Sequence, residues 1–143
     1  MKSFRKKVAV ITGAGSGIGR YLAVLLARDG SDVCVCDVNE KTLGETVTML
    51  RKYNVSVSSH ILDVSNKQSI DELPEKVIKD HGKVDLVFNN AGVGCGSYFK
   101  DMDEDHWDRV MGINFEGVVN STRAFLPHMI NNSEAAIVNT SSI

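Results

Sequence analysis

The chain has 143 residues, a hydrophobic fraction of 43% and a formal net charge of −2 at pH 7. These values are typical of one soluble globular domain that is long enough to bury a core. Because the net charge is close to zero, there is no electrostatic reason to expect binding to nucleic acid or to an anionic membrane, and neither is expected as a partner.

Apolar strands and amphipathic helices are predicted to alternate through the first half. Residues 7–12 form a strand that is buried on both faces, because its apolar run is continuous. Helical spacing follows and ends at Gly30. Residues 33–36 form a second strand that Asp37 closes, and a helix begins near Glu40.

The second half continues the alternation. Strands are predicted at residues 55–62, 84–89 and 136–139, and a long helix at 103–130. Pro74 lies inside the helical segment 70–81, so this helix either bends there or begins near Pro74. Together the elements predict an α/β fold, a doubly wound parallel sheet with helices on both faces.

A glycine-rich segment, T-G-x-x-x-G-x-G, runs from Thr12 to Gly19 between the first strand and the first helix. Glycines allow a tight turn and a close approach of the backbone to a pyrophosphate at the helix N-terminus. The alternative is a plain strand-to-helix turn. We favour a dinucleotide-binding turn.

Asp37 ends the second strand, where a carboxylate can accept both ribose hydroxyls of an adenosine. The same charge would repel a 2′-phosphate, and residues 14–16 include no basic side chain to bind one. NAD is therefore favoured over NADP. A solvated aspartate in a turn is the alternative.

These features, with Asn89-Asn90-Ala91-Gly92 after the fourth strand, resemble the short-chain dehydrogenase/reductase (SDR) family over all 143 residues. The resemblance is to its nucleotide-binding, Rossmann-like N-terminal half, and it assigns residues 1–143 to one NAD-binding domain. It also implies a structural role for Asn89. The cofactor-binding residues that it implies are Gly13, Ser16, Gly17, Ile18, Gly19, Asp37, Asp63, Val64, Asn90, Ala91 and Gly92.

Two catalytic residues follow from the resemblance alone. Asn114 corresponds to the asparagine that holds a water on the family's proton relay, although an asparagine used only for packing is the alternative. Ser142 corresponds to the serine that hydrogen-bonds the substrate carbonyl or hydroxyl. Residues 93–97 are expected to flank the substrate cleft.

The family's acid/base, a tyrosine in a Y-x-x-x-K motif, has no counterpart here. Residues four positions after Tyr21, Tyr53 and Tyr98 are Leu25, Val57 and Met102. We therefore expect an NAD-dependent oxidoreductase that interconverts an alcohol and a carbonyl by hydride transfer, seen here truncated after its fifth strand and inactive alone. The alternatives are a non-catalytic NAD-binding module, one piece of a split protein, or a methyltransferase, which the Asn-Asn-Ala-Gly tetrad and Ser142 disfavour.

The remaining expectations concern cellular setting and partners. Cys34, Cys36 and Cys95 are odd in number and two alternate in one strand, which predicts reduced core thiols, no metal site and a cytoplasmic protein. The apolar run 8–11 is too short for a signal peptide or membrane span. In the resembled fold the fifth strand would end the chain at an open edge, so a second copy or a complementing C-terminal segment is expected to cover it.

Overall fold

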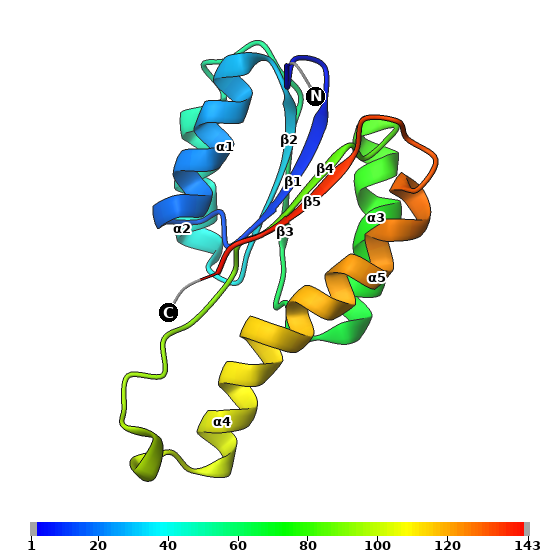
Figure 1. Cartoon of the computed structure of the whole chain (residues 1–143). Coiled ribbons are helices and arrows are strands. Elements are labelled where there is room, and N and C mark those ends of the chain that lie inside the picture. Colours follow the sequence, from blue (N-terminus) through cyan, green and yellow to red (C-terminus); the bar gives the residue numbers. More distant parts are fainter. Residues whose placement is uncertain (1–2, 142–143) are drawn as a thin grey trace.

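Residues 3–141 are described by a computed structural model, in which one parallel sheet lies between two layers of helices (Figure 1). Its strands are β1 Val8–Thr12, β2 Asp32–Asp37, β3 Val57–Ile61, β4 Leu86–Asn89 and β5 Ala136–Asn139. They lie in the order β3-β2-β1-β4-β5 and every pairing is parallel. The predicted doubly wound fold is therefore confirmed, while Ser142 lies outside the described residues.

Helices cover both faces of the sheet. Figure 1 shows α1 (Gly17–Asp29) and α2 (Glu40–Leu50) on one side, and α3 (Lys67–His81) and α5 (Gly117–Met129) on the other. The shorter helix α4 (Glu104–Met111) extends beyond the sheet. None of these helices within residues 3–141 is long and apolar enough to cross a membrane.

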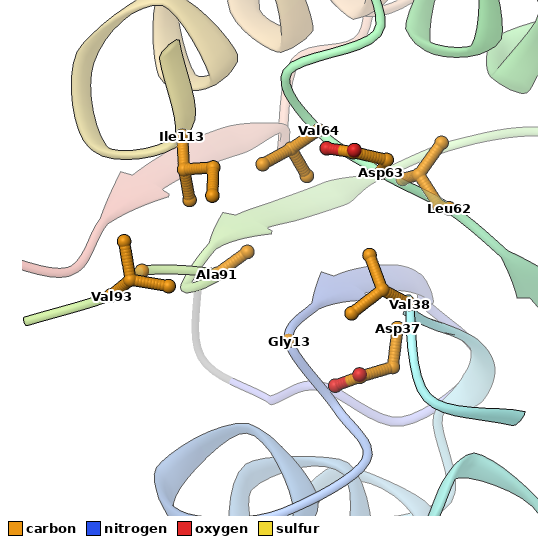
Figure 2. A pocket seen from close by; sticks show the side chains of 10 residues that line it. Gly13, Asp37, Val38, Leu62, Asp63, Val64, Ala91, Val93 and Ile113 are labelled. Carbon is orange, nitrogen blue, oxygen red and sulfur yellow. The ribbon is translucent and has the colours of Figure 1, made fainter. Parts of the chain in front are cut away.

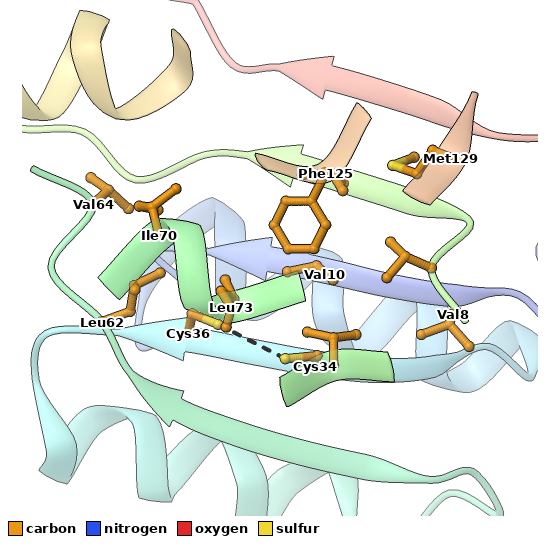
Figure 3. Packing of buried hydrophobic residues seen from close by; sticks show 13 residues of the cluster. Val8, Val10, Cys34, Cys36, Leu62, Val64, Ile70, Leu73, Phe125 and Met129 are labelled. Atoms are coloured by element: carbon orange, nitrogen blue, oxygen red, sulfur yellow. Dashed lines mark hydrogen bonds between the residues drawn. The ribbon is translucent and has the colours of Figure 1, made fainter. Parts of the chain in front are cut away.

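The core consists of two apolar layers, one on each face of the sheet. Alternate residues of β1 belong to one layer or the other. Ala9 and Ile11 pack with α1 and α2, whereas Val8 and Val10 pack with α3 and α5. Figure 3 shows Phe125 of α5 over this second layer. All five residues of β1 are buried, as the continuous apolar run predicted.

Side-chain caps begin the helices close to where the sequence placed them. The Asn39 side chain accepts from Thr42 N at 3.0 Å and begins α2, and α1 ends at Gly30 as predicted. Asn66 accepts from Ser69 N at 3.0 Å, so α3 begins at Lys67 and runs through Pro74. The alternative in which this helix begins near Pro74 is wrong, because the Asn66 cap and the buried apolar side chains of the first turns extend the helix toward the N-terminus.

The predicted long helix 103–130 is interrupted in its middle. Between α4 and α5 the chain makes a π-helical turn over Gly112–Glu116, which contains Asn114. Such turns are inserted bulges that occur often at functional sites. Side-chain periodicity does not report this change, because the residues on both sides keep helical spacing.

Two of the three cysteines lie in the core, and all three are free thiols. Cys34 and Cys36 lie on the α3 side of β2 with their sulfur atoms 3.9 Å apart (Figure 3). The hydrogen bond from Cys36, with further support from His60, lowers the pKa of Cys34 to about 5, and the same pairing raises the pKa of Cys36. Cys95 is exposed. Within residues 3–141 no group of three or more His, Cys, Asp or Glu side chains is placed to hold a metal ion.

Candidate cofactor-binding site

A cavity of about 110 Å³ lies where the C-terminal ends of the strands meet (Figure 2). Loops after β1, β2, β3 and β4 all contribute to its wall, as expected for a ligand site at a topological switch point of an open α/β sheet. Six residues singled out from the sequence line it, namely Gly13, Asp37, Asp63, Val64, Ala91 and Gly92. The other lining residues are Val38, Leu62, Val93 and Ile113.

The turns after β1 and β4 are tied together by Thr12 and Asn90. Thr12 Oγ1 accepts from the backbone amides of Asn90 at 3.0 Å and Ala91 at 3.1 Å. The Asn90 side chain donates to Thr12 O at 3.2 Å. The two turns lie so close that a β-carbon at Gly13 would be 2.8 Å from Ala91 Cα. Within the first turn, a β-carbon at Gly19 would overlap the Gly13 carbonyl oxygen and lie 2.6 Å from Asn90 Nδ2. A glycine is therefore required at position 19.

The Asp37 carboxylate is held by two backbone amides. Its Oδ2 accepts from Gly15 N at 2.8 Å and its Oδ1 from Asn39 N at 3.0 Å. An ionised carboxylate has about four acceptor positions, so lone pairs are left for hydroxyl donors from a ligand. The side chain of Asp37 is thus fixed in the cavity wall next to the glycine turn (Figure 2).

Ser16, Gly17, Ile18 and Gly19 lie where α1 begins and do not line the cavity itself. The first amides of a helix have no partner within the helix and carry its positive dipole end, which attracts anions. The first turn of α1 contains no acidic side chain that would compete for them, and Ile18 is 70% exposed. The start of α1 therefore has the geometry of an anion-binding site, and this site lies beside the fixed Asp37 carboxylate.

The opposite part of the wall is apolar. Val64 is buried beneath Gly117, where a β-carbon at position 117 would lie 3.0 Å from it, and Figure 2 shows Val38, Val64 and Ile113 around the same opening. Asp63 turns its carboxylate to its own loop, accepting from Ser65 N at 2.9 Å. Sequence reasoning missed Val38, Leu62 and Ile113. Val38 carried a usable signal in the sequence, because it is apolar and directly follows Asp37 at the end of a strand.

A second cavity of about 440 Å³ adjoins the first and shares Ala91, Gly92 and Val93 with it. Asn114, Val118, Thr140 and Ser141 also line it, and so do Asn90 and Gly94. The Asn114 carboxamide accepts from Val93 N and donates to Val93 O, each at 2.9 Å. The π-helical turn thus places Asn114 to hold the loop after β4. Thr140, which donates to Asn90 Oδ1 at 3.2 Å, was also missed from the sequence.

The chain belongs to the short-chain dehydrogenase family, whose profile matches residues 7–143. Among curated proteins, it is similar to the 3-oxoacyl-[acyl-carrier-protein] reductase FabG of Thermotoga maritima, with 36% identity over 96% of this chain and 56% of that protein. The methyltransferase alternative is therefore wrong.

Solved structures agree. A short-chain dehydrogenase/reductase from Burkholderia phymatum in complex with NAD matches with a TM-score of 0.94 and 43% identity, over 99% of this chain and 51% of that one. NAD⁺-bound xylitol dehydrogenase matches with a TM-score of 0.91 and 34% identity, over 99% and 55% of the two chains. The chain thus spans about half the length of these relatives.

Proposed function

We propose that the protein is an NAD-dependent oxidoreductase that interconverts a small alcohol and its carbonyl, with residues 1–143 as its NAD-binding domain. The observation that carries the proposal is the Asp37 carboxylate, anchored by the amides of Gly15 and Asn39 in the wall of a largely apolar cavity at the C-terminal edge of the sheet. Membership of the family and the resemblance to NAD-bound relatives support it.

The preference for NAD over NADP rests on charge. A 2′-phosphate would bring two negative charges against the fixed Asp37 carboxylate, and juxtaposed like charges cost several kcal/mol. The nearby guanidinium of Arg20 does not offset this repulsion, because it is already paired with Glu45 at 2.9 Å. Ser16, Gly17, Ile18 and Gly19 would bind the diphosphate, Asp63 and Val64 would border the adenine, and Asn90, Ala91 and Gly92 would meet the central riboses.

Bound NAD supplies a hydride acceptor, and residues of the second cavity would orient the substrate beside it. Asn114 fixes the Val93 backbone there and is proposed to hold a water on the proton relay. Ser142 is proposed to hydrogen-bond the substrate oxygen. The 143 residues include no Tyr-x-x-x-Lys motif, and a positioned acid/base contributes typically about 10²–10⁴ in rate. These residues alone are therefore proposed to bind NAD without turnover.

A second candidate is a non-catalytic NAD-binding module or one piece of a split protein, which the residues lining the first cavity support equally. Isothermal titration tests what both candidates share, and we expect NAD to bind at least tenfold more tightly than NADP. The intact mass of the native protein then separates the two candidates. A mass near 15.6 kDa supports the module or split protein, and a much larger mass supports the enzyme.

The binding partners of the protein and its cellular compartment are also proposals. Leu126 of α5, Ile130 directly after α5 and Val138 of β5 are 45%, 68% and 44% exposed at one edge of the sheet. A second copy of the chain or a complementing C-terminal segment is proposed to cover this edge, which sedimentation of the native protein tests. The exposed free thiol of Cys95 fits a reducing compartment, the cytoplasm.

A further inference from the structure

Arg20 contacts both the cofactor turn and helix α2, in addition to its exposed ion pair with Glu45. From α1 its Nη2 donates to the carbonyl oxygen of Gly15, to Thr42 O at 3.0 Å and to Glu45 Oε2 at 2.9 Å. Its Nε donates to Thr46 Oγ1 at 3.0 Å. The guanidinium therefore joins the turn after β1 to helix α2.

Thr46 extends this network to the preceding carbonyl. Its side chain is fully buried, and its hydroxyl donates to Ala14 O at 2.9 Å. Because Arg20 Nε is the donor to Thr46 Oγ1, the single hydroxyl proton of Thr46 is available to carbonyl oxygens, and Ala14 O at 2.9 Å is nearer than Thr42 O at 3.2 Å. Two consecutive carbonyls of the turn are thus fixed, that of Ala14 by Thr46 of α2 and that of Gly15 by Arg20 of α1.

Fixing those carbonyls also aims the amides of the same peptide units. In a planar trans peptide the C=O and N–H bonds point in opposite directions. The Gly15 amide therefore points away from Thr46, and it donates to Asp37 Oδ2 at 2.8 Å. By the same geometry the Ser16 amide points away from Arg20.

We propose that Arg20 is the positioning residue of the cofactor turn, and that with Thr46 it aims the Gly15 amide at Asp37 and the Ser16 amide toward the diphosphate. This inference rests on the proposed NAD-binding function. The Arg20–Glu45 pair alone would not do this, because exposed ion pairs contribute little and the Glu45 side chain is 48% exposed.

The test compares Arg20→Met, Thr46→Val and the double variant by isothermal titration of the purified protein with NAD and with ADP-ribose, which lacks the nicotinamide. Loss of the charge-assisted contacts in Arg20→Met is expected to raise both dissociation constants by the same factor, about tenfold or more. Thr46→Val is expected to have a smaller effect in the same direction. The double variant should match Arg20→Met, because the two residues act as one unit.

Arg28→Met is the matched control, since Arg28 is exposed on the same helix and forms no ion pair within residues 3–141. Thermal unfolding monitored by circular dichroism establishes that each variant is folded at the titration temperature. A purely structural Arg20 would lower the melting temperature and leave the affinity of the folded protein unchanged, which overturns the inference. Additive effects in the double variant also overturn it. If the unmodified protein fails to bind NAD, the proposed function itself is wrong.

Discussion

Gly15 and Asp37 are in direct contact through a 2.8 Å hydrogen bond from the Gly15 amide to Asp37 Oδ2. A β-carbon at Gly15 would lie 2.8 Å from Asp37 Cγ and 2.6 Å from Thr42 Oγ1. The Asp37 carboxylate and the glycine turn therefore form one packed unit, in which a larger residue at position 15 would displace the Asp37 side chain.

The first prediction follows from that contact. Gly15→Ala should displace the Asp37 carboxylate and weaken NAD binding about tenfold or more, because a truncated or misplaced charged hydrogen bond is worth about 1.5–3 kcal/mol. Isothermal titration measures the change. Gly44→Ala is the matched control, since a β-carbon there meets nothing within 4 Å and should stabilise helix α2 slightly. Equal NAD affinity in Gly15→Ala and the unmodified protein would contradict the prediction.

Substitution of Asp37 itself should change which cofactor is preferred. Asp37→Asn keeps the size of the side chain and removes its charge, so NAD should bind more weakly while the repulsion of a 2′-phosphate disappears. The ratio of the NADP and NAD dissociation constants is expected to fall at least tenfold. Competition titration of both cofactors gives the ratio, and an unchanged ratio would show that Asp37 does not set the preference.

Asn114 is predicted to order the loop after β4. Asn114→Leu removes both hydrogen bonds to Val93 at similar side-chain volume, so the Val93 amide should exchange its hydrogen at least tenfold faster. Native-state hydrogen exchange measures this rate. Gln68→Leu, at an exposed position of α3, serves as the control. Unchanged exchange at Val93 would reject this role.

Asp85 joins three segments at the other end of the sheet and should matter for stability. Its Oδ2 accepts from Val8 N at 2.9 Å and lies 2.7 Å from Lys83 Nζ, while Oδ1 accepts from Asn132. Burial raises the pKa of Asp85, but these three partners outweigh it and leave the pKa below 3.8. Asp85→Ala leaves the Val8 amide unsatisfied, so the free energy of unfolding should fall by about 1–3 kcal/mol.

The pH dependence of this contribution has a defined sign. Because the pKa of Asp85 is lowered in the folded state, its stabilisation is complete above 3.8 and is lost as the pH falls through the lower folded value. Urea unfolding at pH 7, where the stabilisation by Asp85 is complete, measures how far Asp85→Ala lowers the free energy of unfolding. Asp71→Asn, which removes an exposed pair with Lys67, should change stability far less. Similar losses in both variants would count against the prediction.

His60 should give the opposite pH dependence. The nearby Cys34 sulfur, and then the charge of Asp80, raise the pKa of His60 above its usual 6.5. Asp80 Oδ2 lies 3.1 Å from His60 Nε2, and the adjacent His81 is hydrogen-bonded to Ser58 Oγ. Protonation of His60 therefore stabilises the fold fully below pH 6.5, and this stability is lost as the pH rises through the raised folded pKa.

Asp80→Asn should reduce this dependence. The urea midpoints at pH 6 and pH 9 should differ less in the variant than in the unmodified protein, because one group that favours the charged imidazole is gone. Glu72→Gln on the exposed side of the same helix is the control. If Asp80→Asn keeps the full difference between the two midpoints, the His60–Asp80 pair does not contribute to it.

Patterns of side chains predicted most of the architecture because they are local consequences of burial. The continuous apolar run of β1 is buried on both faces, and Gly30 ends α1, because strand and helix periodicities follow directly from which faces meet the core. The glycine turn and Asp37 were also found from spacing, since both follow the ends of buried strands. Pro74 was misleading in one respect, because packing and the Asn66 cap outweigh its local effect.

The sequence by itself determined the parallel α/β fold, the family and the residues around which a dinucleotide site can form. Tertiary structure alone decided that Arg20 and Thr46 of neighbouring helices fix the carbonyls of the glycine turn, and that a π-helical turn directs Asn114 to Val93. The physical reason is range. Propensity and periodicity act over one or two helical turns. The contacts of Thr46 with Arg20 and Ala14, and of Asn114 with Val93, instead join residues 26, 32 and 21 positions apart, whose approach depends on how the helices pack on the sheet.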